Sequence, residues 1–136
     1  MPKFVNELVA TPKKTRAAAV KNLLEAIARK NINLDGYGEF GGAVHLLSPD
    51  SKSARRVLKS AGFKVTEQKV LVLETQNHPG GALGLFKEIN STKSVIDFVY
   101  YLSDHRIAVG SREAQRISKL VLNKQLKDSK KLSRPR

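Results

Sequence analysis

The apolar positions follow two spacings along the chain, one typical of helices and one typical of strands. Val20, Leu23, Leu24 and Ile27 lie at i, i+3, i+4 and i+7 and predict a helix. Runs rich in Val, Leu, Ile and Phe predict the strands. In chain order we expect strands at 4–10, from 31, at 43–47, from 63, at 69–75, at 95–102 and at 105–109, and helices over 15–29, 48–62, 81–90 and from 111.

Polar residues, glycines and prolines mark how these elements are expected to end. Ser48 precedes Pro49 and is expected to cap its helix. Glycines on both sides of Glu39 predict a bulged hairpin around that residue, and Ser103-Asp104 predicts a tight turn. The polar run Thr66–Gln68 is expected to bridge two halves of the chain.

The chain nearly repeats itself at an offset of 62 residues. Leu23-Leu24 then falls on Leu85-Phe86, Ile27 on Ile89 and Ala18 on Gly80. Two copies at a fixed offset indicate a duplicated domain. Each copy has the order β-α-β-β-α, with a final strand clear only in the first, which is the ferredoxin-like pattern. We therefore predict an α+β fold of two ferredoxin-like βαββαβ repeats, residues 1–66 and 67–126, with antiparallel sheets joined side by side and helices on one face.

The segment Val70–Leu83 is the main candidate for a binding site. A strand-like run enters Asn77-His78-Pro79-Gly80-Gly81, and a helix is expected to follow. Such a loop exposes unpaired backbone N–H groups, glycines let a ligand approach, and the helix dipole favours an anion. The alternative is a plain turn between strand and helix, in which Pro79 and Gly80 have no role in binding.

The net charge of +13 raises a second function, binding to nucleic acid. Basic residues gather at 13–16, at 55–59 and in residues 127–136, which we predict to be a disordered basic tail beginning after about Leu126. Basic tails and basic helix faces are also common as plain solvated surface. Phosphate contacts by Lys and Arg would make such binding sensitive to salt.

Other classes of function lack their sequence signals. The chain contains no cysteine, its three histidines are scattered, and it has no GxGxxG or P-loop motif and no set of nucleophile, base and orienting residue. We predict a protein that is not an enzyme and has no metal or cofactor. No run of 18 apolar residues and no signal-peptide core are present, so a cytoplasmic protein without a membrane span is expected.

Taken together, these motifs resemble the ACT domain, a small regulatory module of amino-acid metabolism. The matching residues are Asn77-His78-Pro79-Gly80, Leu85-Phe86, Ile89 and Ile96-Asp97-Phe98, with Leu23-Leu24, Ile27 and Asn31–Leu34 in the first copy. The chain from residue 4 to about 124 is similar to a stand-alone pair of ACT domains. The resemblance implies a regulatory protein that binds an amino acid or similar metabolite and acts on a separate metabolic enzyme.

The resemblance also implies a place for the ligand, where the strand–loop–helix turn of one repeat meets the second strand of its neighbour. The implied ligand-binding residues are Gln76, Asn77, His78, Gly80, Gly81 and Ala82 with Asn31, Ile32, Asn33 and Leu34. Backbone N–H groups near Gly80–Ala82 would hold the carboxylate, and an Asn or Asp side chain, with Asp97 and Asp35 in reserve, would hold the amine.

Two departures from the family pattern limit the number of sites. The first repeat has Thr11–Arg16 in place of a Pro-Gly turn and Ala18 in place of the glycine, so one site or none is expected rather than two. Edge strands are consistent with a homodimer. The alternative function is a basic ferredoxin-like module that binds RNA or DNA, with Gly36–Phe40 similar to an aromatic RNA-binding strand.

Overall fold

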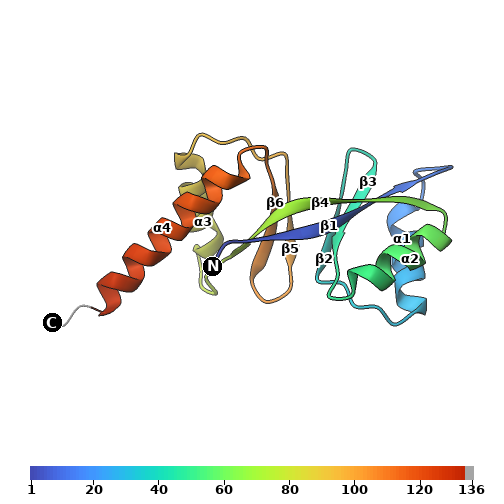
Figure 1. Cartoon of the computed structure of the whole chain (residues 1–136), viewed down its shortest axis with the longest axis horizontal. Coiled ribbons are helices and arrows are strands. Elements are labelled where there is room, and N and C mark those ends of the chain that lie inside the picture. The colour runs from blue at the N-terminus through green and yellow to red at the C-terminus, as the bar shows by residue number, and fades with distance from the viewer. Residues whose placement is uncertain (134–136) are drawn as a thin grey trace. The chain divides into compact units, whose positions relative to one another are not determined.

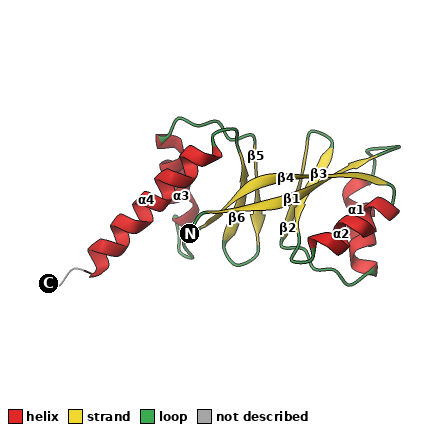
Figure 2. Cartoon of the chain, viewed as in Figure 1, coloured by secondary structure: helices red, strands yellow, loops and turns green. Residues whose placement is uncertain are grey.

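The computed structural model describes residues 1–133 as six strands and four helices (Figures 1 and 2). The elements are β1 (Lys3–Pro12), α1 (Ala19–Arg29), β2 (Gly36–Phe40), β3 (Ala43–Leu47), α2 (Ser51–Ser60), β4 (Phe63–Glu74), α3 (Gly81–Ser91), β5 (Phe98–Leu102), β6 (Arg106–Gly110) and α4 (Ala114–Ser133). Among the described residues, none of the helices is long and apolar enough to span a membrane.

The strands form one six-stranded sheet in the order β2-β3-β1-β4-β6-β5. The pairs β1–β3, β2–β3 and β4–β6 are antiparallel. The chain divides into two compact units. We call Val5–Lys69 with Tyr100–Ser103 the N-terminal unit, and Met1–Phe4, Val70–Val99 and Asp104 onward the C-terminal unit. The long strands β1 and β4 contribute residues to both units.

The N-terminal unit has its two helices on one face of its strands. Leu8 of β1 and Val44 of β3 are fully buried in one apolar cluster with Leu23 of α1 and Leu58 of α2. Alternate strand residues point to opposite faces, so Glu7 and His45 lie on the other face of these strands. Burying such apolar side chains is the main stabilising contribution, about 1.5–3 kcal/mol each.

The C-terminal unit repeats this arrangement with α3 and α4. Leu71 and Leu73 of β4 and Ile107 of β6 share a cluster with Ile89 of α3 and Ile117 of α4. The start of β1 belongs to this unit, with Phe4 packed against the same cluster. The first residues of the chain therefore take the place of the final strand that is missing from the second repeat, because β1 lies beside β4.

Equivalent residues of the two repeats adopt the same backbone conformation. Ala18 and Gly80 precede α1 and α3 and are both left-handed, with φ of 58° and 81°. The Ser48 hydroxyl donates to the Asn33 carbonyl at 2.7 Å, and the Ser111 hydroxyl donates to the Val95 carbonyl at 2.6 Å. These matches confirm the duplication, and with it the α+β fold of two ferredoxin-like repeats.

Some local expectations differ from the structure. Asn31–Leu34 is a turn and loop, and the strand expected there is β2, because Asn31 adopts a left-handed φ of 54° directly after α1. The first hairpin is regular: Phe40 pairs with Ala43 across Gly41-Gly42, which have φ of 59° and 80°. The second hairpin turns through the expected Ser103-Asp104 and one further residue, His105, and Asp104 and His105 both have positive φ.

The remaining corrections concern strand and helix ends. Thr66–Gln68 forms the middle of β4, which runs without interruption and passes from the N-terminal to the C-terminal unit between Lys69 and Val70. Asp50, not Ser48, caps α2, because its carboxylate accepts the Ser53 N–H at 3.2 Å. The helix α4 continues to Ser133, so 127–133 is helical instead of disordered, since Lys, Gln and Leu are good helix formers and no glycine or proline intervenes. Residues 134–136 of the expected tail lie outside the described residues.

Candidate ligand-binding site

The turn between β4 and α3 has the geometry expected of a strand–loop–helix binding loop. Gly80 is the N-cap of α3 in a left-handed conformation, and no side chain caps the helix. The Gly81 N–H donates to the His78 carbonyl at 3.0 Å, and the His78 N–H donates to the Gln76 carbonyl at 2.9 Å. A Cβ on Gly81 would lie 2.0 Å from the Gln76 carbonyl oxygen, so only glycine allows the turn to close this tightly.

A shallow hollow of about 590 Å³ opens over this turn in the C-terminal unit. All six loop residues that the sequence assigns to the ligand line it. The lining consists of Thr75, Gln76, Asn77, His78, Pro79, Gly80, Gly81, Ala82, Leu83 and His105. The first N–H groups of a helix have no partner within it, and those of Ala82 and Leu83 stand in the first turn of α3. The Gly81 N–H is already used by the turn, so Ala82 and Leu83 are better placed to receive a carboxylate.

The His78 side chain is held by the turn itself. Its Nδ1 lies 2.9 Å from the Pro79 carbonyl oxygen, and its Nε2 contacts the side-chain oxygen of Gln76. The imidazole is exposed and closes the loop on its own backbone. These contacts favour the interpretation in which His78 stabilises the turn over one in which it is free to bind a carboxylate.

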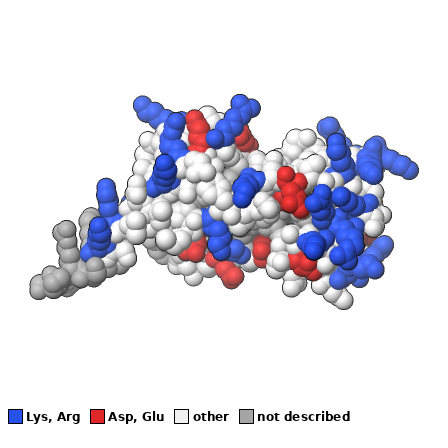
Figure 3. Space-filling view, in the orientation of Figure 1, with Lys and Arg blue, Asp and Glu red and all other residues white. Residues whose placement is uncertain are grey.

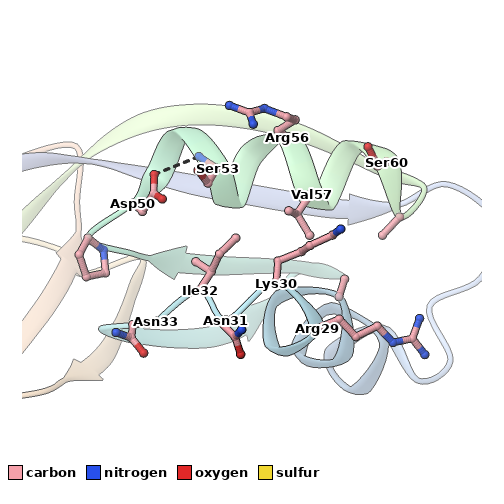
Figure 4. A pocket seen from close by; sticks show the side chains of 13 residues that line it. Arg29, Lys30, Asn31, Ile32, Asn33, Asp50, Ser53, Arg56, Val57 and Ser60 are labelled. Carbon is pink, nitrogen blue, oxygen red and sulfur yellow. Dashed lines mark hydrogen bonds between the residues drawn. The ribbon is translucent and has the colours of Figure 1, made fainter.

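The second predicted group, Asn31–Leu34, belongs to the N-terminal unit, whereas the loop residues belong to the C-terminal unit. Ile32 and Leu34 are partly buried against the apolar cluster of the N-terminal unit, so their side chains serve packing. Asn31 and Asn33 are exposed, and their side chains point away from α2 (Figure 4). Asp97, a reserve amine ligand, lines a different pocket with Val95, Arg112 and Glu113, and Asp35 lies in the N-terminal unit.

Sequence reasoning missed a buried polar cluster in the N-terminal unit. The Glu7 carboxylate is fully buried and receives the Tyr100 hydroxyl at 2.8 Å, His45 Nδ1 at 3.0 Å and Gln68 Nε2 at 2.5 Å. Burial raises the pKa of Tyr100 above its ordinary value, and the negative charge of Glu7 adds to this. A glutamate inside an apolar strand was the available signal, but its partners come from distant parts of the chain.

Phe40 and Tyr100 of the same unit are engaged in packing. The Phe40 ring meets the His45 ring edge-on with centroids 5.4 Å apart and lies 6.2 Å from the Tyr100 ring. A Cβ on Gly36 would collide with the Tyr101 carbonyl, which shows how closely β5 residues cover β2 within this unit. Phe40 is therefore not free to stack on a base of RNA, whereas Tyr37 of the same strand is 44% exposed.

Basic side chains gather over α1 and α2 of the N-terminal unit (Figure 3). Exposed members are Lys21 and Arg29 of α1, Lys30, and Lys52, Arg56 and Lys59 of α2. Arg55 instead donates to Glu67 at 3.0 Å. Within residues 1–133, no three His, Cys, Asp or Glu side chains come together in a way that could hold a metal ion.

Comparison with known proteins places this geometry within a recognised fold. The sequence matches no family model and no curated protein. The structure is similar to protein BT0572 from Bacteroides thetaiotaomicron, with a TM-score of 0.69 and 17% identity over 91% of this chain and 90% of that one. It is also similar to the regulatory subunit of aspartate kinase from Thermus flavus, with a TM-score of 0.52 and 14% identity over 90% and 95% of the two chains.

A third similar structure is a putative C-terminal regulatory domain of aspartate kinase from Porphyromonas gingivalis, with a TM-score of 0.51 and 12% identity over 90% of this chain and 96% of that one. The chain thus has the tandem ferredoxin-like fold of these regulatory domains over nearly its whole described length. The resemblance to paired ACT domains is confirmed at the level of the fold.

Proposed function

We propose that this protein is a non-catalytic regulatory protein of amino-acid metabolism that binds a free amino acid in the hollow over Gln76–Leu83. The observation that carries the proposal is the convergence of all six loop residues implied by the ACT resemblance on one hollow at a helix N-terminus. The fold shared with regulatory domains of aspartate kinase supports the same class of function.

The chemistry of the hollow suits the α-carboxylate of an amino acid. The N–H groups of Ala82 and Leu83 and the positive end of the α3 dipole attract a carboxylate. The Gly80 and Gly81 positions carry no side chain that would block the approach. The amide groups of Gln76 and Asn77, both exposed at the rim, can accept hydrogen bonds from the ligand amine.

The proposal extends to the way in which ligand binding produces a regulatory effect. The regulatory effect requires that the ligand bind one state of the protein better than another, for example a homodimer or a complex with a metabolic enzyme.

The first experiment is a thermal-shift screen against the twenty amino acids, followed by calorimetric titration of any ligand found. One ligand at 100 times its Kd should stabilise the protein by about 2.7 kcal/mol. Gly80→Asp places a negative charge at the N-terminus of α3 and should weaken binding by about tenfold or more. Gly41→Asp is the matched control, because Gly41 also has a left-handed φ, of 59°, with open space around its Cα.

Two results would contradict the proposal. One is a panel in which no amino acid stabilises the protein. The other is a ligand whose affinity is the same in Gly80→Asp and Gly41→Asp. A short RNA and a DNA duplex belong in the same screen, because a response only to nucleic acid that falls steeply with salt would favour the alternative function.

A further inference from the structure

A second concave site lies in the N-terminal unit, in the groove between α2 and the segment that follows α1. The groove has a volume of about 730 Å³, within the range of small-molecule sites. Figure 4 shows Lys30 and Ile32 pointing toward α2, and Val57 pointing back toward them. The groove has no residue in common with the hollow over Gln76–Leu83.

Part of the lining of the groove is apolar. Ile32 and Val57 face each other across it, and Ala26 and Ala61 add small apolar surfaces to its lining. Ile32 and Val57 are only partly buried, so each leaves apolar surface exposed to solvent. A ligand with an apolar or planar body would cover this surface and gain about 25 cal/mol for each Å² removed from water.

The rim of the groove is cationic. Arg29, Lys30 and Arg56 line it, and all three are exposed. Among residues 1–133, no carboxylate forms an ion pair of 4.0 Å or less with Lys30 or Arg56, and Arg29 reaches Glu25 only at 4.0 Å. Arg29 and Arg56 point outward at the two edges, where flexible side chains can turn onto a ligand (Figure 4).

The one acidic side chain of the lining is already engaged. The Asp50 carboxylate caps α2 by accepting the Ser53 N–H at 3.2 Å. Three cations against one carboxylate leave a net positive charge of two, which matches a dianion. Guanidinium groups match phosphate geometry with paired hydrogen bonds, and a phosphate ester carries about 1.5–2 negative charges at pH 7.

We propose that this groove binds a small organic phosphate, with the phosphate held by Lys30 and Arg56 and the organic body against Ile32 and Val57. The proposal goes beyond the amino-acid site and does not depend on it. It gives the protein a second kind of ligand, bound in a different unit. The body of this ligand is apolar, whereas the body of an amino acid carries a charged amine.

The test is calorimetric titration of the full chain with AMP, adenosine, inorganic phosphate and succinate. AMP should bind with a saturable isotherm, and the other three should bind at least about tenfold more weakly, because each lacks the phosphate or the body. The Lys30→Gln/Arg56→Gln variant should weaken AMP binding by about tenfold or more. Both side chains are exposed, so thermal unfolding should change little.

The matched control is Lys59→Gln/Lys64→Gln, which removes the same charge from exposed positions of the N-terminal unit that do not line the groove. Its AMP affinity should stay within about twofold of the wild type, since charges outside contact are screened by salt. In NMR spectra, AMP should shift the amide signals of 30–33 and 53–61. Signals of 76–83 should stay in place, which separates this site from the amino-acid site.

Several outcomes would overturn the proposal. The first is the absence of saturable AMP binding, and the second is adenosine or succinate binding as tightly as AMP. Equal loss of affinity in both double variants would mean general attraction to the basic surface, and a DNA duplex would then compete equally with AMP. Shifts confined to 76–83 would move the ligand to the other hollow.

Discussion

The substitution Tyr100→Phe removes one oxygen atom and is expected to lower the free energy of unfolding by about 2 kcal/mol. The Tyr100 hydroxyl donates to Glu7 Oε1 at 2.8 Å, and the Glu7 carboxylate is fully buried. The other carboxylate oxygen receives His45 Nδ1 and Gln68 Nε2. A buried carboxylate is stable only while its oxygens receive hydrogen bonds, so the loss of one donor raises the free energy of the folded state.

The magnitude follows from the charge on the acceptor. A hydrogen bond to a charged group contributes about 1.5–3 kcal/mol, more than a bond between neutral groups. The phenylalanine ring keeps the tyrosine ring position, 6.2 Å from Phe40, so the packing term changes little. For a chain of this length, about 2 kcal/mol corresponds to a fall in Tm of roughly 8 °C.

The assay is urea unfolding at pH 7, followed by circular dichroism, with Tyr101→Phe as the control. Tyr101 is the next residue along β5 and is 74% exposed, so loss of its hydroxyl should change stability by less than about 0.5 kcal/mol. The slope of the transition should be the same in all three proteins. If Tyr100→Phe and Tyr101→Phe were equally stable, the buried carboxylate would not depend on this hydroxyl and the reasoning would fail.

Three further predictions concern pH and backbone geometry. Burial, and then the charge of Glu7, raise the pKa of Tyr100 in the folded protein, so above about pH 10 the unfolded chain binds fewer protons at this residue than the folded one. The free energy of unfolding of the wild type should therefore fall as the pH rises, and urea unfolding at pH 8 to 11 should show its difference from Tyr100→Phe becoming smaller. Ala18→Gly should raise the free energy of unfolding by roughly 0.5–1 kcal/mol, because it relieves a left-handed alanine, whereas Ala28→Gly in the last turn of α1 should lower it; thermal unfolding of both variants checks this. Gly81→Ala should lower the free energy of unfolding by about 2 kcal/mol or more, since its Cβ would strike the Gln76 carbonyl. Gly84→Ala, with open space and helical backbone, should be neutral or stabilising, and equal melting temperatures for the two variants would contradict this reasoning.

The repeat and the helix faces were predictable because they depend on local periodicity. The apolar positions of α1 and α3 stand at matching offsets, and Leu23 and Ile27, with Leu85 and Ile89, are among the buried residues of their helices. The loop from Gln76 to Ala82 was predictable for the same reason: a strand, a Pro-Gly pair and a helix start follow one another within a few residues. All six loop residues line one hollow.

The errors fall where contacts between distant residues decide the structure. Ile32 and Leu34 alternate with polar residues as a strand would, but both pack as loop residues onto the apolar cluster, and β2 forms at Gly36–Phe40 instead. Glycines at 36 and 38 argue against a strand locally, yet a Cβ there would collide with Tyr101 and with Phe40. The partner of Glu7 is 93 residues away at Tyr100, which no local pattern reveals.

The two repeats have kept one turn geometry and given it different chemistry. The Ala19 N–H donates to the Arg16 carbonyl at 3.3 Å, which matches the bond from Gly81 to His78 at an offset of 62 residues. In the first repeat this turn carries the methyl groups of Ala18 and Ala19. The Arg16 guanidinium also occupies the space beside Gly42, 2.8 Å from where a Cβ would be. In the second repeat both alanines are replaced by Gly80 and Gly81, and the backbone is open to a ligand. Since a carboxylate must reach the helix N–H groups, we expect the proposed amino-acid site once per chain rather than twice.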